Sequence, residues 1–444
     1  MFLLKNGLIA KENGLEKKDI LIKGETIEKI SSSIENSEAK VIDCSGKFII
    51  PGGIDVHTHF DIDVGIKSAD DFYSGGIAAI YGGTTTIIDH PGFGPKGCSL
   101  NHQINLYKTL AKNCPIDYSF HGVIQYVSDN LEEEIIELKN NGISSYKLYM
   151  TYTYALSDME ILKVFSLAKK HNLTIAVHAE NNDIIQYLRD EMIKNQDLDT
   201  IFHAKSRPAY TEVEAVERLL FLAKTTEFKK LYFVHISSGE TLKILDNARK
   251  NSIDFFIESC PQYLFLSEKK YLEKDGVNYI LSPPLRSKKD NKIVKDYINS
   301  NLIDVIGTDH CSFSIEDKNK GVHDFTKCPN GIPGVQERIP LMFSEFLKGN
   351  ITLQSFLNTC CLNPAKIFGL SKKGTLDIGN NADIVILSPE EFKFTSPKSK
   401  ANYSCYKDIH SLVSVDTVFI RGNIVLKDKN LFNPEFKGIF LPRK

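Results

Sequence analysis

The stretch Pro51-Gly52-Gly53-Ile54-Asp55-Val56-His57-Thr58-His59 follows a short apolar run, Phe48-Ile49-Ile50. It begins with a Pro-Gly-Gly turn signal and ends in two histidines one residue apart. On an extended chain, side chains two residues apart point the same way, so His57 and His59 face one side together. Two imidazoles at the end of a strand can bind a metal ion. A His-x-His pair can also be two ordinary polar residues of a loop. The pattern of the rest of the chain distinguishes a metal-binding pair from this simpler interpretation.

The composition is that of an ordinary globular protein. The chain has 444 residues, 42% hydrophobic and 25% charged, enough for two or three domains or for one large α/β barrel with an appendage. A formal charge of −2 gives no basic surface for nucleic acid, so we expect no such partner. The chain has no apolar run of about 18 residues and no signal-peptide pattern. Nine cysteines without a Cys-x-x-Cys pair fit a cytoplasmic protein with reduced thiols.

Both ends of the chain are rich in predicted strands. Residues 19–23 and 26–30, separated by Gly24-Glu25, predict a β-hairpin, and Gly422-Asn423 predicts a second hairpin turn within residues 418–426. Residues 382–387 have the same strand character. Since a lone hairpin is marginal in water, we expect residues 1–50 and 370–432 to form one small β-sandwich. Residues 433–444 hold two prolines and little periodicity, which predicts a tail or arm.

Between these ends, residues 51–369 alternate strands with helices, the pattern of βα units around a parallel sheet. Ser157 and Glu160 form a capping-box pattern at the start of one helix, and residues 211–224 carry the apolar face of another. Eight such units favour a closed (β/α)8 TIM barrel. The eight expected strands are Phe48–Asp55, Thr84–Asp89, Asp117–Val123, Ser144–Met150, Thr174–His178, Leu231–His235, Phe255–Ser259 and Ile303–Gly307.

Barrel enzymes carry their chemistry at the carboxyl ends of the strands. If the barrel prediction is right, four histidines, an aspartate and a lysine lie together there. These residues are His57, His59, Lys147, His178, His235 and Asp309.

Lys147 is the unusual member of this set. An ammonium group buried in an apolar strand is costly, and two nearby dications would raise that cost further. A neutral amine can instead react with carbon dioxide to give an anionic carbamate whose two oxygens suit a pair of metals. The alternative is a lysine paired with a carboxylate at the barrel mouth, and the residues alone favour neither.

Eight segments in order resemble the cyclic amidohydrolases of the amidohydrolase superfamily, most closely the dihydropyrimidinase and D-hydantoinase family. They span nearly the whole chain, which makes the resemblance specific. The segments are residues 51–59, Ser145-Tyr146-Lys147-Leu148-Tyr149-Met150-Thr151-Tyr152, His178-Ala179-Glu180-Asn181, Val234-His235-Ile236-Ser237, residues 258–264, residues 282–286, residues 307–311 and residues 329–334.

The resemblance implies a binuclear site, with zinc the expected metal. His57, His59 and Asp309 would hold one ion, His178 and His235 the other, and carboxylated Lys147 (N6-carboxylysine) and a hydroxide would bridge them. That hydroxide would open the cyclic amide bond of a dihydropyrimidine or a 5-substituted hydantoin, with Asp309 passing the proton to the leaving nitrogen. Tyr152 would polarise the scissile carbonyl, and Ser282 and Asn330 would bind the ring amide. The remaining histidines would have no ligand role: His90, His102, His121, His171, His203, His310, His323 and His410.

The resemblance also carries expectations about specificity and assembly. The loops at residues 60–68 and 92–97 would shape the pocket for the ring substituent, without indicating which dihydropyrimidine, hydantoin or enantiomer fits. Family members are usually homotetramers or homodimers. Residues 403–408 lack the acidic residue and glycine that usually follow the second tyrosine, which leaves details of the sandwich and the assembly open.

Other functions remain as alternatives. Dihydroorotases usually place an arginine after the His-x-His, whereas here Phe60-Asp61-Ile62-Asp63 follows, an apolar and acidic run that would repel a carboxylate substrate. The Pro-Asn-Gly-Ile-Pro-Gly segment at residues 329–334 disfavours allantoinase. A non-catalytic scaffold relative would have lost ligands that this chain keeps, and a mononuclear deaminase would not need Lys147.

Overall fold

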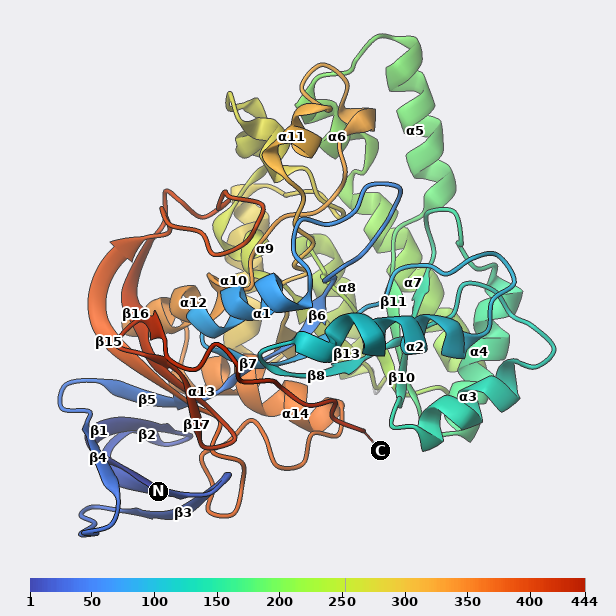
Figure 1. Cartoon of the computed structure of the whole chain (residues 1–444). Helices are drawn as coiled ribbons and strands as arrows, with labels where there is room; N and C mark the ends of the chain where they lie inside the picture. Colours follow the sequence, from blue (N-terminus) through green and yellow to red (C-terminus); the bar gives the residue numbers. More distant parts are fainter. Residues whose placement is uncertain (252, 444) are drawn as a thin grey trace.

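The computed structural model describes residues 1–251 and 253–443 and shows a mixed α/β fold (Figure 1). Its described strands form one nine-stranded sheet and two parallel sheets of three and six strands. Figure 1 shows the nine-stranded sheet, drawn in blue and in orange to red, at one end of the molecule beside the helix-rich part. The fold therefore separates into a region built from both ends of the sequence and a region built from its middle.

The nine-stranded sheet joins the two ends of the chain directly. β5 pairs antiparallel with β15, placing Ile384 opposite Pro51, and buried Ile49 and Ile386 help to fill the core of this region. Both expected hairpins are confirmed, as the β2–β3 and β16–β17 pairs. The strands of this sheet are β1 (Phe2–Lys11), β2 (Gly14–Lys23), β3 (Thr26–Ser31), β4 (Lys40–Asp43), β5 (Phe48–Pro51), β15 (Ile384–Lys393), β16 (His410–Ile420), β17 (Asn423–Lys427) and β18 (Asn430–Leu431).

The chain passes from one sheet to another at Gly52, which corrects the expected single strand Phe48–Asp55. β5 ends at Pro51 in the nine-stranded sheet, and β6 (Gly53–Thr58) then pairs with β7 (Thr84–Asp89). A Cβ atom at Gly52 would lie 2.2 Å from the Thr85 Oγ1 atom, so only glycine allows this close crossing. The strand that carries His57 therefore begins at Gly53 and extends to Thr58, and His59 follows directly after its end.

The parallel strands follow one another in chain order. β6, β7 and β8 form the three-stranded sheet, and β9 to β14 form the six-stranded one. At His121 the chain changes its hydrogen-bonding neighbour from β7 to β10, which splits the expected strand Asp117–Val123 into β8 and β9. A parallel bridge between Thr58 and His310 links the end of β6 to the segment after β14. The further strands are β8 (Asp117–Phe120), β9 (Gly122–Val123), β10 (Ser145–Tyr149), β11 (Thr174–His178), β12 (Leu231–Phe233), β13 (Phe256–Ser259) and β14 (Val305–Ile306).

Helices connect the parallel strands. The capping box at Ser157 and Glu160 is confirmed at the start of α4, and the helix expected at residues 211–224 extends over Ala209–Thr226. No described helix is long and apolar enough to span a membrane. The α-helices are α1 (Phe72–Tyr81), α2 (Leu100–Leu110), α3 (Leu131–Asn140), α4 (Asp158–Lys170), α5 (Asn182–Lys194), α6 (Thr200–Ser206), α7 (Ala209–Thr226), α8 (Gly239–Lys250), α9 (Pro261–Phe265), α10 (Lys288–Asn299), α11 (Ile315–Asn319), α12 (Arg338–Leu347), α13 (Leu353–Leu357) and α14 (Asn363–Ile367). Short turns of other helix types are η1 (Ala111–Asn113), η2 (Glu268–Leu272), η3 (Gly276–Tyr279), η4 (Phe325–Lys327) and η5 (Asn358–Leu362).

The segment after β18 returns to the parallel strands. Phe440 forms a parallel bridge with Tyr118 of β8, and the Leu441 amide donates to the Tyr118 carbonyl oxygen at 2.7 Å. Arg443 is fully buried. This segment is therefore an arm that packs against the region formed by the middle of the chain.

Candidate metal centre

One cavity of about 570 Å³ collects the site residues expected from the sequence. It lies where β6, β10 and β11 end and where the chain leaves β12 and β14. Its lining includes all nine of them: His57, His59, Lys147, Tyr152, His178, His235, Ser282, Asp309 and Asn330.

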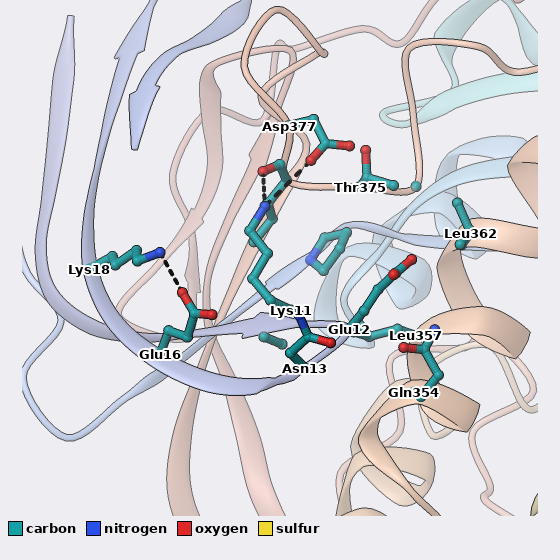
Figure 2. A pocket seen from close by; sticks show the side chains of 14 residues that line it. Lys11, Glu12, Asn13, Glu16, Lys18, Gln354, Leu357, Leu362, Thr375 and Asp377 are labelled. Carbon is teal, nitrogen blue, oxygen red and sulfur yellow. Dashed lines mark hydrogen bonds and ion pairs between the residues drawn. The ribbon is translucent and has the colours of Figure 1, made fainter. Parts of the chain in front are cut away.

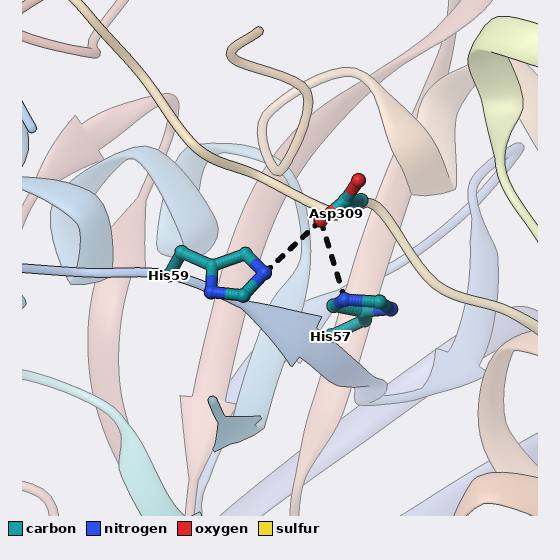
Figure 3. Close-up of side chains that lie close together, drawn as sticks. All are labelled: His57, His59 and Asp309. Atoms are coloured by element: carbon teal, nitrogen blue, oxygen red, sulfur yellow. Dashed lines mark ion pairs between the residues drawn. The ribbon is translucent and has the colours of Figure 1, made fainter. Parts of the chain in front are cut away.

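The first group in this cavity consists of His57, His59 and Asp309 (Figure 3). The Asp309 Oδ1 atom lies 3.2 Å from His57 Nε2 and 3.1 Å from His59 Nε2. His59 donates its Nδ1 proton to the His90 carbonyl oxygen at 3.1 Å, so its Nε2 atom carries a lone pair when the ring is neutral. Burial holds the pKa of His57 well below its usual value, which favours a neutral imidazole there.

The second group consists of His178 and His235. The His178 Nδ1 and His235 Nε2 atoms lie 3.0 Å apart, and both rings are buried. His178 directs its other nitrogen, Nε2, toward the Glu180 Oε2 atom at 2.8 Å. Although burial raises the pKa of Glu180, the nearby Arg207 guanidinium and His178 lower it to about 2, so Glu180 is an acceptor. His178 therefore presents the lone pair of Nδ1 to His235.

Lys147 is 1% exposed and points into the same cavity. Burial lowers its pKa to about 8, an effect that Asp309 and Glu258 partly oppose. Among the residues that the structure describes, no carboxylate oxygen lies within 4.0 Å of its amine, so the alternative of a paired lysine finds no partner here. A lysine in this setting can become a neutral nucleophile near neutral pH.

These donors fit divalent cations. Buried His57 Nε2 has no hydrogen-bond partner, and like His59 Nε2 it faces a carboxylate oxygen. A lone pair that faces an anionic oxygen is repelled unless a cation lies between them. Imidazole nitrogens together with a carboxylate are the ligands that zinc prefers.

Backbone strain is concentrated at this centre. Three of its residues have left-handed backbone conformations, with φ of 69° at Tyr152, 38° at His235 and 53° at Asp309. Such angles are unfavourable for residues with a Cβ atom and persist where the surrounding structure enforces them. The fold thus holds two predicted metal ligands and the predicted oxyanion donor in costly conformations.

The residues expected to bind the substrate lie beside the metal ligands. The Tyr152 ring packs edge-on against His178, with ring centroids 5.2 Å apart, and the Arg207 guanidinium lies 5.5 Å from the Tyr152 ring centre. Asn330 Nδ2 donates to Ser282 Oγ at 3.0 Å. The hydroxyl and amide groups therefore share one wall of the cavity.

The two loops expected to shape the substituent pocket form another wall. Ile62 and Val64 come from the first loop, and Phe93 comes from the second. The Phe93 ring lies 4.9 Å from that of Tyr149 and 4.8 Å from that of Tyr154. This apolar and aromatic surface suits an uncharged organic ring.

Sequence reasoning missed the groups that hold the predicted ligands in place. Glu258 accepts from His57, Glu180 accepts from His178, and the His90 carbonyl group accepts from His59. A partial signal was present for two of them, because Glu258 and Glu180 are carboxylates at the ends of apolar strands. Their partners, however, follow only from the three-dimensional arrangement.

Two further features lie outside this centre. His310 accepts the Gly334 amide at Nδ1 and contacts Asp70 through Nε2 at 3.1 Å, as a structural residue would. A second cavity, of about 340 Å³, contains none of the predicted site residues (Figure 2). Its Lys11 and Lys18 side chains are paired with Asp377 and Glu16.

Comparison with known proteins identifies the family to which this chain belongs. The sequence profile of the amidohydrolase family matches residues 48–425, and the chain belongs to this family. The kinship with D-hydantoinases and dihydropyrimidinases expected from the eight segments is confirmed by the relatives described next.

A D-phenylhydantoinase of Escherichia coli is 40% identical over 453 aligned positions, covering 100% of this chain and 98% of the relative. The crystal structure of dihydropyrimidinase from Brevibacillus agri has a TM-score of 0.97 at 32% identity, covering 100% of this chain and 98% of the other. An L-hydantoinase (dihydropyrimidinase) from Arthrobacter aurescens has a TM-score of 0.89 at 29% identity, covering 97% of this chain and 98% of the other. The similar proteins thus include both a D- and an L-hydantoinase.

Proposed function

We propose that this chain is a binuclear metal-dependent cyclic amidohydrolase that opens the ring amide of dihydropyrimidines or 5-substituted hydantoins. One observation carries the proposal: four buried imidazoles, Asp309 and Lys147 converge on a cavity with an apolar, aromatic wall. The names of the relatives, hydantoinase and dihydropyrimidinase, point to the same substrates. When bound, two divalent ions would supply hydroxide at neutral pH and polarise the amide carbonyl.

The chain's own residues would do the remaining work. His57, His59 and Asp309 would hold one ion, His178 and His235 the other, and Lys147 would bridge them after capturing carbon dioxide. Zinc is the metal that this donor set favours.

Substrate handling falls to a second set of residues. The Tyr152 hydroxyl would donate to the carbonyl oxygen as negative charge grows there, and Asp309 would accept a proton and return it to the leaving nitrogen. Ser282 and Asn330 would orient the ring amide. Their mutual hydrogen bond at 3.0 Å keeps both groups on one wall of the cavity.

The cavity disfavours an anionic substrate. Among the described residues that line it there is no arginine, whereas Asp63 is present. A dihydroorotase needs a cationic partner for the substrate carboxylate, and the Asp63 carboxylate would repel that group. An uncharged ring avoids this repulsion.

The proposal includes a finer architecture. We assign residues 51–369 to a (β/α)8 barrel in which β8 and β9 count as one strand interrupted at His121. The bridge between Thr58 and His310 supports closure, because it links the first strand to the segment after the last. Residues 1–50 and 370–432 would form the β-sandwich, and residues 433–444 the arm.

The deciding experiment is a hydrolysis assay of the metal-loaded protein over dihydrouracil, 5-substituted hydantoins, allantoin and dihydroorotate. We expect ring opening of the first two classes, seen as loss of ultraviolet absorbance of the cyclic amide. Preference for dihydroorotate or allantoin would overturn the proposal, and so would a purified protein that binds no divalent metal and shows no amidase activity when metal is supplied. We also propose a cytoplasmic location, and a homotetramer or homodimer as the family resemblance implies. Light scattering would measure the oligomeric state.

A further inference from the structure

Glu258 lies beneath the proposed metal centre without lining its cavity. It sits on β13, is fully buried, and uses both carboxylate oxygens. Its Oε1 atom lies 2.5 Å from His57 Nδ1 and accepts the backbone amide of His235 at 3.0 Å. Its Oε2 atom accepts the Tyr232 hydroxyl at 2.8 Å.

The fold leaves space for this carboxylate. A Cβ atom at Gly307, on the neighbouring segment, would lie 3.0 Å from the Glu258 side chain, which is tighter than nine in ten real Cβ contacts. Glycine at this position therefore allows Glu258 to reach across to His57, 201 positions earlier in the sequence. The contact is built into the packing of the strands.

The hydrogen bonds of Glu258 determine which ring nitrogen of His57 carries the proton. Since Oε1 already accepts the His235 amide, it acts as an acceptor toward His57 Nδ1 as well. The proton of neutral His57 then resides on Nδ1, and the lone pair on Nε2 points toward Asp309. A carboxylate that orients a histidine ligand in this way also raises its basicity.

The unusual feature is that one oxygen supports both halves of the centre. His57 belongs to the group proposed to hold one ion, whereas His235 belongs to the group proposed to hold the other. Glu180, by comparison, contacts only His178 among the proposed ligands.

We propose that Glu258 is a shared positioning residue whose single carboxylate orients His57 and fixes the His235 backbone, so that both metal ions depend on it. This inference rests on the proposed function, because it concerns the same two ions. It predicts that loss of the Glu258 carboxylate lowers the affinity for both metal ions together. Loss of the Glu180 carboxylate should lower chiefly the affinity for the ion bound by His178.

The test measures zinc retained per chain during titration with a chelator. We expect Glu258→Gln to release both ions at about 10–100-fold lower chelator concentration than the wild-type chain, and Glu258→Ala to release them more readily still. Better zinc retention in Glu258→Gln than in Glu258→Ala would show that orientation of His57 matters, since the glutamine amide oxygen can still accept a hydrogen bond from His57. Cobalt-substituted protein gives a second readout, with altered visible absorption bands in Glu258→Gln.

Two variants serve as comparisons. Glu337→Gln changes another buried glutamate, which accepts the Ser404 hydroxyl and touches no proposed ligand, and should retain zinc as the wild type does. Tyr232→Phe removes only the donor to Oε2 and should weaken retention less than Glu258→Gln. If Glu258→Ala does not fold, circular dichroism shows this, and the isosteric glutamine variant carries the test.

The outcomes separate the two proposals. A wild-type chain that binds two ions, with unchanged retention in Glu258→Gln, overturns the inference and leaves the proposed function standing. Selective loss of one ion from Glu258→Gln overturns the shared role. A wild-type chain that binds no ion overturns the proposed function and this inference with it.

Discussion

Arg443 donates a hydrogen bond from Nη1 to the Ser145 Oγ atom at 2.8 Å, at the start of the strand that carries Lys147. Its Nε atom also donates to Ser119 Oγ at 2.9 Å, and Nη2 donates to the Phe120 carbonyl oxygen. Ser145 Oγ in turn lies 2.7 Å from His121 Nδ1. The buried Arg443 guanidinium of the arm thus links β8, through Ser119 and Phe120, to β10, through Ser145.

We therefore expect Arg443→Ala to lower the free energy of unfolding by about 2–4 kcal/mol, because it removes three buried hydrogen bonds and leaves a cavity. Urea denaturation followed by circular dichroism measures the change. Lys437→Ala, an exposed change on the same arm, should cost less than about 0.5 kcal/mol. Equal stability of the two variants would show that the arm adds nothing through Arg443.

The contacts of this arm could not be predicted from the sequence. The parallel strands were found because they are apolar runs that end in polar residues, a local pattern. Nothing local distinguishes Arg443 from a solvated residue, since its partners Ser119 and Ser145 lie some three hundred positions earlier. The same applies to the site: strand-end positions indicated His178 and His235, whereas the support from Glu258 depends on tertiary packing. The crossing at Gly52 was missed because the apolar residues on both sides of the Pro-Gly-Gly turn signal were assigned to one strand, whereas they belong to two different sheets.

A buried ion-pair cluster connects the nine-stranded sheet with the parallel strands. Lys373 donates to Asp117 of β8 at 2.9 Å and to Asp383, and all three side chains are buried. Lys373→Met would leave the buried Asp383 carboxylate without a charged partner and leave Asp117 paired with Arg421 alone, so we expect the free energy of unfolding to fall by about 3–5 kcal/mol. Neighbouring Lys372 is exposed, and Lys372→Met should leave the denaturation midpoint unchanged. A neutral result for Lys373→Met would mean that water or rearrangement compensates the two acids.

Lys147 should give metal uptake a particular pH dependence. With a pKa of about 8, about a tenth of its amine is neutral at pH 7, against roughly one in three thousand for an ordinary lysine. Because only the neutral amine captures carbon dioxide, the rate at which metal-free protein takes up two zinc ions should rise about tenfold between pH 6 and 7 and level off above pH 8. The measurement holds dissolved carbon dioxide constant at each pH. A flat profile would argue against a carbamate.

Lys147→Ala should abolish binding of the zinc pair, because alanine has no amine that could capture carbon dioxide and so cannot supply the proposed bridging carbamate. Metal analysis of the purified variant should find one ion or none per chain, and ring opening should fall to background. A variant that keeps two ions and full turnover would refute the bridging role.

Three tyrosines line the cavity, and only Tyr152 is expected to assist the reaction directly. Tyr152→Phe keeps the ring against His178 but removes the hydroxyl that would stabilise the developing oxyanion. We expect kcat to fall by about 10²–10³-fold with a small change in KM, because the lost bond strengthens only in the transition state. Tyr154→Phe, which keeps its packing on Phe93, should stay within about threefold of the wild type. Should Tyr154→Phe instead suffer the large loss in kcat while Tyr152→Phe stays active, the oxyanion donor is Tyr154 and the motif position of Tyr152 is misleading.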